Sequence, residues 1–391
     1  MNNKRENLFY VAVLLFWFAQ YVYIPFLNPF MSGIGISATI VGVIGGVYGV
    51  TQMALRIPLS IGASLAPSHK PVILGGLASV ILSCSLPLFS HSWAAFFVAR
   101  ALAGVSSSTW ISYTAYQLEG AGDAANSRMG LIMACNTGGI CLSQLVGTAV
   151  YDRVGIDGLF VIGALAAAAG GALILLTPFR MRFDNGDKRV RFDWRLWIGV
   201  AKNRQLWICS ALMSIGWWAM FSTNYGFTGV FGAERLGASS VQLGLIAFVC
   251  QIASMAVSLI FGRLKERKLP ERALLTLAFI LFGIYCAASP HCTDAGALIV
   301  LQVIGGAAIA VPNVLLFANA GRELSKGQQL LAMGIFQSVY SIGMTVGPFV
   351  SGLIVDAPGG GFAPMFYSVA AVSCTGAVVT LVFYREKWGK T

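Results

Sequence analysis

The sequence is poor in charged side chains, and above all in acidic ones. Charged residues make up 10% of the 391 positions, and Asp and Glu together number only 15. A soluble domain carries about 25% charged residues. Apolar residues, in contrast, make up 57% of the chain. Too little charge is present to cover a water-facing surface of this size, which argues against a soluble enzyme and a disordered chain. We therefore expect a membrane protein that crosses the bilayer many times.

The sequence also lacks the patterns that carry most protein chemistry. No CxxC pair, HExxH zinc motif, GxSxG elbow or phosphate-binding loop occurs. The eight cysteines lie mostly inside apolar runs, where they are expected to pack as small apolar side chains. The three histidines, His69, His91 and His291, fall near segment ends and form no ligand cluster. We expect no enzyme, no metal site and no cofactor.

A net charge of +11 raises the question of nucleic acid as a partner. The bases, however, occur in short clusters between long apolar runs. A nucleic-acid site needs them on one contiguous face. We therefore expect no nucleic-acid partner.

Twelve apolar runs are long enough to cross a membrane. A hydrocarbon core about 30 Å thick needs about 20 apolar residues in a helix, and the backbone in lipid must satisfy its own hydrogen bonds. The runs lack the period-two alternation of a membrane β-barrel. The predicted fold class is therefore all-α, with twelve transmembrane helices. The predicted spans are 8–30, 40–63, 71–90, 93–117, 128–150, 157–179, 206–231, 240–261, 272–290, 295–319, 329–353 and 363–384.

The positions of the bases predict the orientation. With twelve spans both termini lie on one side, and that side, counted with the edges of the spans, carries 23 of the 26 Lys and Arg residues. The opposite loops carry Arg153 and Arg235, and Arg100 lies within a span. The positive-inside rule therefore predicts cytoplasmic termini in the inner (plasma) membrane of the cell.

The two halves of the chain resemble each other. A shift of 202 residues brings Arg100 onto Gln302 and Gly104 onto Gly306, and a shift of 204 brings Asp152 onto Asp356. Both halves begin on the same side, so the repeats are parallel. We predict a six-helix bundle at 1–180, a basic linker at 181–204 and a second bundle at 205–391. The linker's second part, from Trp194, fits either a helix at the membrane interface or a solvated connection.

Several glycines are spaced so that helices can approach closely. They occur in the second and the eleventh predicted spans, at Gly42, Gly45, Gly46, Gly49, Gly343 and Gly347. We expect tight packing there rather than a hinge.

Short motifs occur at equivalent places in the halves. After the eighth span the chain reads Gly262-Arg-Leu-Lys-Glu266-Arg267, whereas the first copy, which begins at Arg56 and keeps Lys70, has Ser64 in place of the acid. The fourth span carries Arg100-x-x-x-Gly104, and the eleventh carries Gly347-Pro348. With these motifs the whole chain resembles the major facilitator superfamily (MFS), most closely its drug and metabolite exporters.

The resemblance implies an MFS fold, in which two bundles rock about a central cavity lined mainly by spans one, four, seven and ten. It implies gating or structural roles for the motif residues Arg56, Lys70, Gly262, Glu266, Arg267, Gly347 and Pro348. In the family, the acid of the first loop helps to latch the two halves on the cytoplasmic side. Here that latch would depend on Glu266 alone. A Glu266→Gln variant whose inward–outward balance was unchanged in accessibility labelling would contradict this hypothesis.

Polar and aromatic residues recur at helical spacing within the spans. In a bilayer such stripes face protein or water, so they either line a cavity or bond neighbouring helices. Our candidates for substrate contact are Tyr21, Asn28, Arg100, Ser107, Trp110, Trp217, Trp218, Asn224, Tyr225, Gln302, Asn313, Gln337 and Tyr340.

Arg100 is the most informative of these candidates. It lies seven positions into its span, roughly 10 Å from the outer end, and no Asp or Glu lies deep in any span. Two interpretations remain open. Arg100 either caps carbonyls freed by Pro25 or Pro29, or contacts an anionic or strongly polar substrate.

A cavity without a carboxylate cannot offset the cost of burying a cation. The sequence therefore predicts a transporter of small neutral, zwitterionic or anionic organic solutes, tending toward efflux. Without a buried acid to carry a proton, uniport or coupling through the charge of the substrate is expected. Alternatives are an uptake permease for a small organic acid or sugar-like metabolite and, in a different class, a non-transporting receptor or scaffold. The expected partners are the substrate and the lipid bilayer, and the expected state is a monomer.

Overall fold

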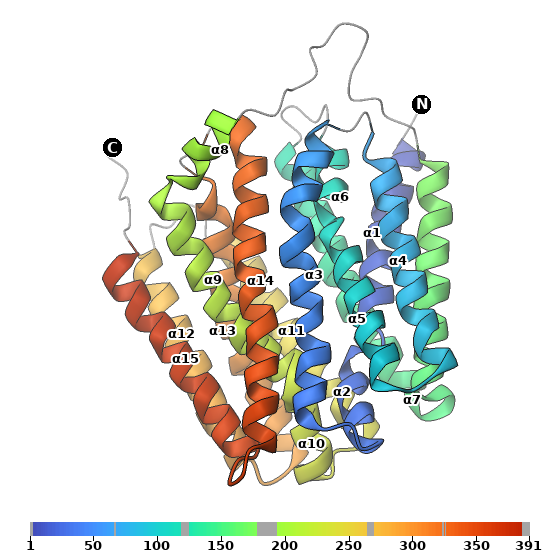
Figure 1. Cartoon of the computed structure of the whole chain (residues 1–391), viewed down its shortest axis with the longest axis vertical. Coiled ribbons are helices and arrows are strands. Elements are labelled where there is room, and N and C mark those ends of the chain that lie inside the picture. Colours follow the sequence, from blue (N-terminus) through green and yellow to red (C-terminus); the bar gives the residue numbers. More distant parts are fainter. Residues whose placement is uncertain are drawn as a thin grey trace, which may run out of the picture.

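The protein is a bundle of long helices, seen here in a computed structural model (Figure 1). The structure describes residues 3–65, 68–118, 125–177, 194–263, 270–322, 324 and 326–384, and no strand occurs in these ranges. The helices of the first half are α1 (Asn3–Tyr21), α2 (Ile24–Gly33), α3 (Ala38–Leu65), α4 (Lys70–Phe89), α5 (Trp93–Ser108), α6 (Trp110–Leu118) and α7 (Ala125–Leu176). After the short α8 (Trp194–Ala201), the second half contains α9 (Arg204–Ser222), η2 (Thr223–Phe227), α10 (Thr228–Leu236), α11 (Ser240–Arg263), α12 (Glu271–Ala288), η3 (Ser289–His291), α13 (Ala295–Ala320), α14 (Lys326–Asp356) and α15 (Phe362–Phe383).

Within the described ranges, eleven helical segments are long and apolar enough to cross a membrane. One of them, within α7, is really two spans. At Gly155 the backbone takes φ 65° and ψ −170°, a left-handed conformation that glycine tolerates and that turns the chain back. Counting α7 twice gives the twelve transmembrane helices predicted from the sequence, and the all-α fold class is confirmed.

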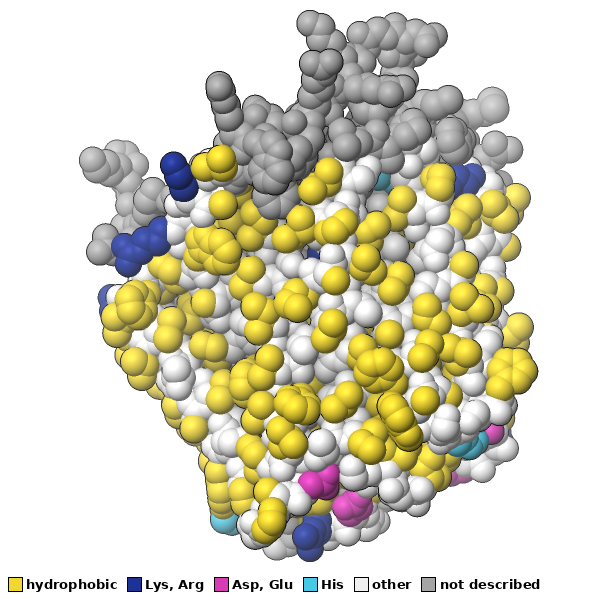
Figure 2. All heavy atoms as spheres, in the orientation of Figure 1, with side chains coloured by type: hydrophobic (Ala, Val, Ile, Leu, Met, Phe, Trp, Pro, Cys, Tyr) yellow, Lys and Arg dark blue, Asp and Glu magenta, His cyan; other side chains and the backbone are white. Residues whose placement is uncertain are grey.

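The outside of the bundle suits lipid. Figure 2 shows hydrophobic side chains over the middle of one face, with basic side chains mainly toward one end and acidic ones near the other. Both N and C lie at the more basic end in Figure 1. We call this the terminal end, and the opposite one the far end.

Two spans are interrupted at equivalent places. The first span breaks at Val22 and Tyr23, between α1 and α2, and the seventh passes through the π-helical turn η2. The same 202-residue shift seen in the sequence relates the two breaks. Interrupted spans free backbone carbonyls near the middle of the membrane, where transporters bind their substrates.

Two pairs of helices join the halves, and they pack differently. The glycine face of α3 lies against α14 from Gly42, beside Pro348, to Ser60, beside Gly334. The pair α7 and α11 is in close contact where Gly244 meets Thr148. The close helix approach predicted from the glycines is confirmed: those of α3 lie against α14, and Gly343 and Gly347 of α14 lie against α9.

At the far end, hydrogen bonds close the junction between the halves. The carboxylate of Asp356, at the end of α14, accepts hydrogen bonds from the backbone N–H groups of Ala38 (3.2 Å) and Thr39 (2.7 Å), at the start of α3. Ser32 in α2 likewise donates to Glu234 in α10.

The predicted linker contains a short helix, and part of the second loop motif lies outside the described residues. Helix α8 forms within the predicted linker, and its Gly199 lies beside Gln328 of α14. Gly262 is part of α11, whereas Glu266 and Arg267 lie outside the described residues. The latch hypothesis for Glu266 therefore stays a prediction.

Candidate substrate cavity

A cavity of about 470 Å³ lies between the two halves. Its wall runs from the middle of the molecule toward the terminal end. The first half contributes Trp17, Tyr21, Tyr48, Gln52, Arg56, Trp110, Met133, Asn136, Thr137 and Ile140. The second half contributes Trp217, Met220, Phe221, Tyr225, Gln251, Ser254, Met255, Ser258, Ile309, Asn313, Val314, Phe317, Gln337, Tyr340 and Met344. A cavity of this size suits a small organic molecule.

Seven of the residues predicted from the polar stripes line this cavity. They are Tyr21, Trp110, Trp217, Tyr225, Asn313, Gln337 and Tyr340. The first, fourth, seventh, tenth and eleventh spans bring them together. Whether they contact substrate stays a prediction.

An aromatic layer bounds the cavity on the side of the far end. Tyr21 and Tyr48 come from the first half, and Phe221 and Tyr225 from the second. The rings of Tyr21 and Tyr225 meet across the junction with their centroids 5.6 Å apart, and those of Tyr48 and Phe221 at 5.7 Å. This layer separates the cavity from the hydrogen-bonded far end.

Asn28 holds the interrupted seventh span instead of lining the cavity. Its Nδ2 donates to the carbonyl oxygens of Tyr225 (2.9 Å) and Gly226 (2.8 Å), both in η2. A π-helical turn leaves such carbonyls in need of donors. Asn28 therefore joins the first half to the break in the second.

Four other predicted residues also lie outside the wall of the large cavity. Asn224 donates to Gln302 (2.7 Å), and Tyr285 bonds both of these residues, so this amide pair is part of an interhelical network. Ser107 lies 2.7 Å from the Tyr48 hydroxyl and holds that ring in place. The backbone of Trp218 packs against Gly343 and Gly347 of α14.

Arg56 corrects the sequence-based assignment of charges. It was counted with the bases at the cytoplasmic edges of the spans, but it lies within α3 and is only 6% exposed. Its Nη1 donates to Gln337 and to the Tyr340 hydroxyl (2.6 Å), and its Nη2 donates to Gln52. The cavity wall therefore contains a cation that joins α3 to α14.

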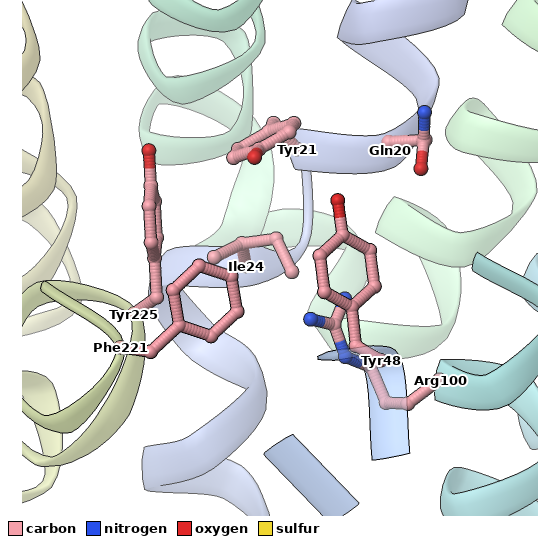
Figure 3. Close-up of a pocket in the computed structure, with 7 residues that line it drawn as sticks. All are labelled: Gln20, Tyr21, Ile24, Tyr48, Arg100, Phe221 and Tyr225. Atoms are coloured by element: carbon pink, nitrogen blue, oxygen red, sulfur yellow. The ribbon is translucent and has the colours of Figure 1, made fainter. Parts of the chain in front are cut away.

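Arg100 lies in a second, much smaller pocket behind the aromatic layer (Figure 3). Its guanidinium faces the ring of Tyr48, with the Cζ atom 4.5 Å from the ring centroid, and Tyr23 lies beside it. Among the described residues, Arg100 donates no hydrogen bond to the carbonyl oxygens of Tyr21 and Pro25, which Pro25 and Pro29 leave without an N–H donor. A cation–π contact thus takes the place of the carbonyl cap considered from the sequence.

The remaining motif residues have structural contacts. Lys70 Nζ donates to the carbonyl oxygens of Leu175 and Thr177, both at 2.9 Å, and so caps the end of α7. Gly347 packs against the backbone of α9, and Pro348 against the glycine face of α3.

Sequence reasoning missed 17 of the 25 residues that line the cavity. Trp17, Tyr48 and Gln52 were not among the candidates, nor were the polar residues of α7 and α11. A signal existed for part of this set, because Tyr48, Gln52 and Arg56 recur every four residues and so share one face of α3. No carboxylate appears on the wall in the part of the chain that the structure describes.

Known proteins resemble this chain throughout its length. The family model described as "Major Facilitator Superfamily" matches residues 9–292 and 233–389. A Deinococcus radiodurans protein named "Putative sugar efflux transporter" is 24% identical over 380 residues, which cover 93% of this chain and 94% of that protein. The Mycobacterium tuberculosis "Multidrug resistance protein Stp" is 30% identical over 148 residues, 38% of this chain and 26% of that protein.

Solved structures share the fold. The nucleoside transporter NupG superposes with a TM-score of 0.72 at 18% identity, and the match covers 99% of this chain and 100% of that one. A bacterial homologue of the lysosomal transporter Spinster also gives 0.72, at 11% identity, covering 98% and 96%. The twelve-span fold, the paired interrupted helices and the family match lead to one conclusion: this chain belongs to the major facilitator superfamily of membrane transporters.

Proposed function

We propose that this transporter moves a small neutral, zwitterionic or anionic organic solute out of the cell by alternating access. The observation that carries the substrate class is the charge of the cavity wall. Arg56 lies on it, and no Asp or Glu among the described residues does. A cationic solute would have nothing there to offset its loss of hydration.

The way the halves join supports alternating access. The far end is closed by Asp356, Ser32 and Asn28, while the cavity lies toward the terminal end. We propose that the terminal end faces the cytoplasm, because most of the bases lie there. The structure then corresponds to a state in which the cavity receives substrate from the cytoplasm.

Two observations support export as the direction of transport: the Gly347-Pro348 element and the word "efflux" in the name of the Deinococcus protein. Both agree with export.

The absence of a carboxylate from the described wall also bears on coupling. A proton-coupled transporter needs a group that gains and loses a proton within the cavity. We propose that the protein works as a uniporter or is driven through the charge of its substrate.

Counterflow in proteoliposomes tests this proposal. A solute identified by thermal shift is loaded inside, and uptake of the labelled solute is measured at zero membrane potential with and without a pH gradient. We expect exchange that a pH gradient leaves unchanged for a non-titrating substrate. Acceleration by the gradient, or exchange of cations alone, would overturn the coupling or the substrate class. Everted vesicles from cells that express the protein should accumulate the solute, and failure to do so would favour uptake.

A further inference from the structure

Four buried nitrogen atoms, in residues that line the cavity, have no hydrogen-bond partner among the described groups. They are Nε1 of Trp17, Nε1 of Trp217, Nε2 of Gln52 and Nε of Arg56. All four are N–H donors. A buried donor without an acceptor is costly, so a ligand that brought acceptors to these residues would remove that cost.

The orientation of the Gln52 amide follows from its neighbour. Arg56 Nη2 donates to the Gln52 oxygen Oε1, and a guanidinium has no acceptor. The amide nitrogen Nε2 must therefore be the free atom. The smaller pocket repeats the pattern, because Gln20 accepts a hydrogen bond from Ser107 (2.8 Å) and leaves its own Nε2 unpaired.

The charge of Arg56 is equally unmatched. Its acceptors, Gln337, Tyr340 and Gln52, are all neutral, and the ring of Tyr340 lies 5.1 Å from its Cζ atom. A buried guanidinium is normally paired with a carboxylate or phosphate, whose two oxygens fit its fork. Within the described wall no such partner exists.

We propose that the substrate is an organic anion and that its carboxylate or phosphate binds Arg56, with the N–H groups of Gln52, Trp17 and Trp217 as further donors. The aromatic wall receives the rest of the molecule. This inference rests on the proposed transport function and narrows its substrate class. The competing ligand is a neutral polyol, because Asn136, Thr137, Ser254 and Asn313 offer both donors and acceptors on the same cavity.

Paired probes separate these ligands. The melting temperature of the purified protein is measured with benzoate against benzamide, glucuronate against glucose, and inorganic phosphate. We expect stabilisation by the acids and little by their neutral partners. Arg56→Gln should abolish it, Arg56→Lys should retain part of it because the charge remains without the fork, and Arg204→Gln, at an exposed base, should behave as wild type. Equal shifts with acids and neutral partners, or acid shifts that survive Arg56→Gln, would overturn the proposal.

A second measurement does not depend on the choice of organic probe. Iodide quenches tryptophan fluorescence on collision, and Trp17, Trp110 and Trp217 line the cavity. Because a positive cavity concentrates anions, we expect iodide to quench the wild-type protein about twofold more strongly than Arg56→Gln. Neutral acrylamide should quench both equally. Equal iodide quenching would show that Arg56 does not attract anions.

The two proposals can fail separately. If proteoliposomes exchange a neutral solute and Arg56→Gln leaves iodide quenching and exchange unchanged, transport stands and the anion site does not. If acids bind through Arg56 but no bound anion ever crosses the membrane, the anion site stands and the transport proposal does not.

Discussion

The two helix pairs that join the halves occupy equivalent positions, but they are packed together over different lengths. The α3 and α14 pair is packed with glycine and serine from Gly42 to Ser60. In the α7 and α11 pair, Thr148 and Gly244 touch near the far end, but toward the terminal end Asn136, Thr137, Ser254 and Ser258 face the cavity. One pair is therefore a continuous seam, and the other holds the halves together at one end only. The difference indicates that α7 and α11 separate more easily at the terminal end.

The largest loss of stability is expected at Gly42, in the tightly packed α3 and α14 pair. A β-carbon at Gly42 would collide with the carbonyl oxygen of Pro348, which is backbone and cannot rotate away. We expect Gly42→Ala to cost about 1–3 kcal/mol and to lower the melting temperature. Gly138→Ala is the matched control, since nothing lies within 4 Å of the added carbon. A stable Gly42→Ala protein would mean that the seam is looser than described.

Asn28 comes second. Replacing it with Ala leaves the carbonyl groups of Tyr225 and Gly226 without their donor, at a cost of about 1–3 kcal/mol. Since this donor joins the halves, the far end should open more often. A cysteine placed at Tyr21, in the aromatic layer, should then react faster with a reagent added on the side of the far end. Unchanged labelling would assign Asn28 to folding alone.

Asp356→Asn should also let the far end open more often, but less than Asn28→Ala does. The carboxylate of Asp356 accepts from Ala38 and Thr39 at the exposed start of α3, where loss of a capping side chain costs about 0.5–2 kcal/mol. Asparagine keeps one acceptor oxygen, so we expect a cost near the lower end of this range. The same cysteine-labelling rate reports it, and Asp294→Asn, which caps α13 within one half, should leave that rate unchanged.

The smallest effect is expected at Gly244, in the second pair. A β-carbon there would meet the side chain of Thr148, whose Oγ1 and Cγ2 atoms can turn away by a change of rotamer. The Cβ atom of Thr148, 2.7 Å from the added carbon, can move only with a small shift of its helix. We expect Gly244→Ala to cost less than Gly42→Ala, and Thr148→Ala, which removes the Oγ1 and Cγ2 atoms, to relieve part of that cost in the double variant, as a double-mutant cycle of melting temperatures would show. Equal costs at both glycines would remove the contrast between the two pairs.

The candidate site was only partly predictable, for a reason visible in particular residues. Tyr225 and Asn224 are neighbours on the same broken span and gave similar sequence signals, yet Tyr225 lines the cavity and Asn224 bonds Gln302. A polar side chain avoids lipid whether it lines a cavity or bonds another helix. A polar stripe in the sequence therefore predicts which face of a helix points into the protein, but not which group that face contacts. Arg56 was assigned to the cytoplasmic edge because a base near the end of a span usually belongs there.

The sequence by itself determined the class of protein, the twelve spans and the shortage of acidic groups within them. These follow from hydropathy and composition, which act locally because lipid excludes charge and unpaired backbone at every position alike. Only the tertiary structure decided that Arg56 lies on the cavity, that Arg100 stands behind Tyr48, and that Asn28 secures the broken seventh span. Those outcomes depend on which helices of the two halves meet, and a buried polar group takes its role from the partner that reaches it.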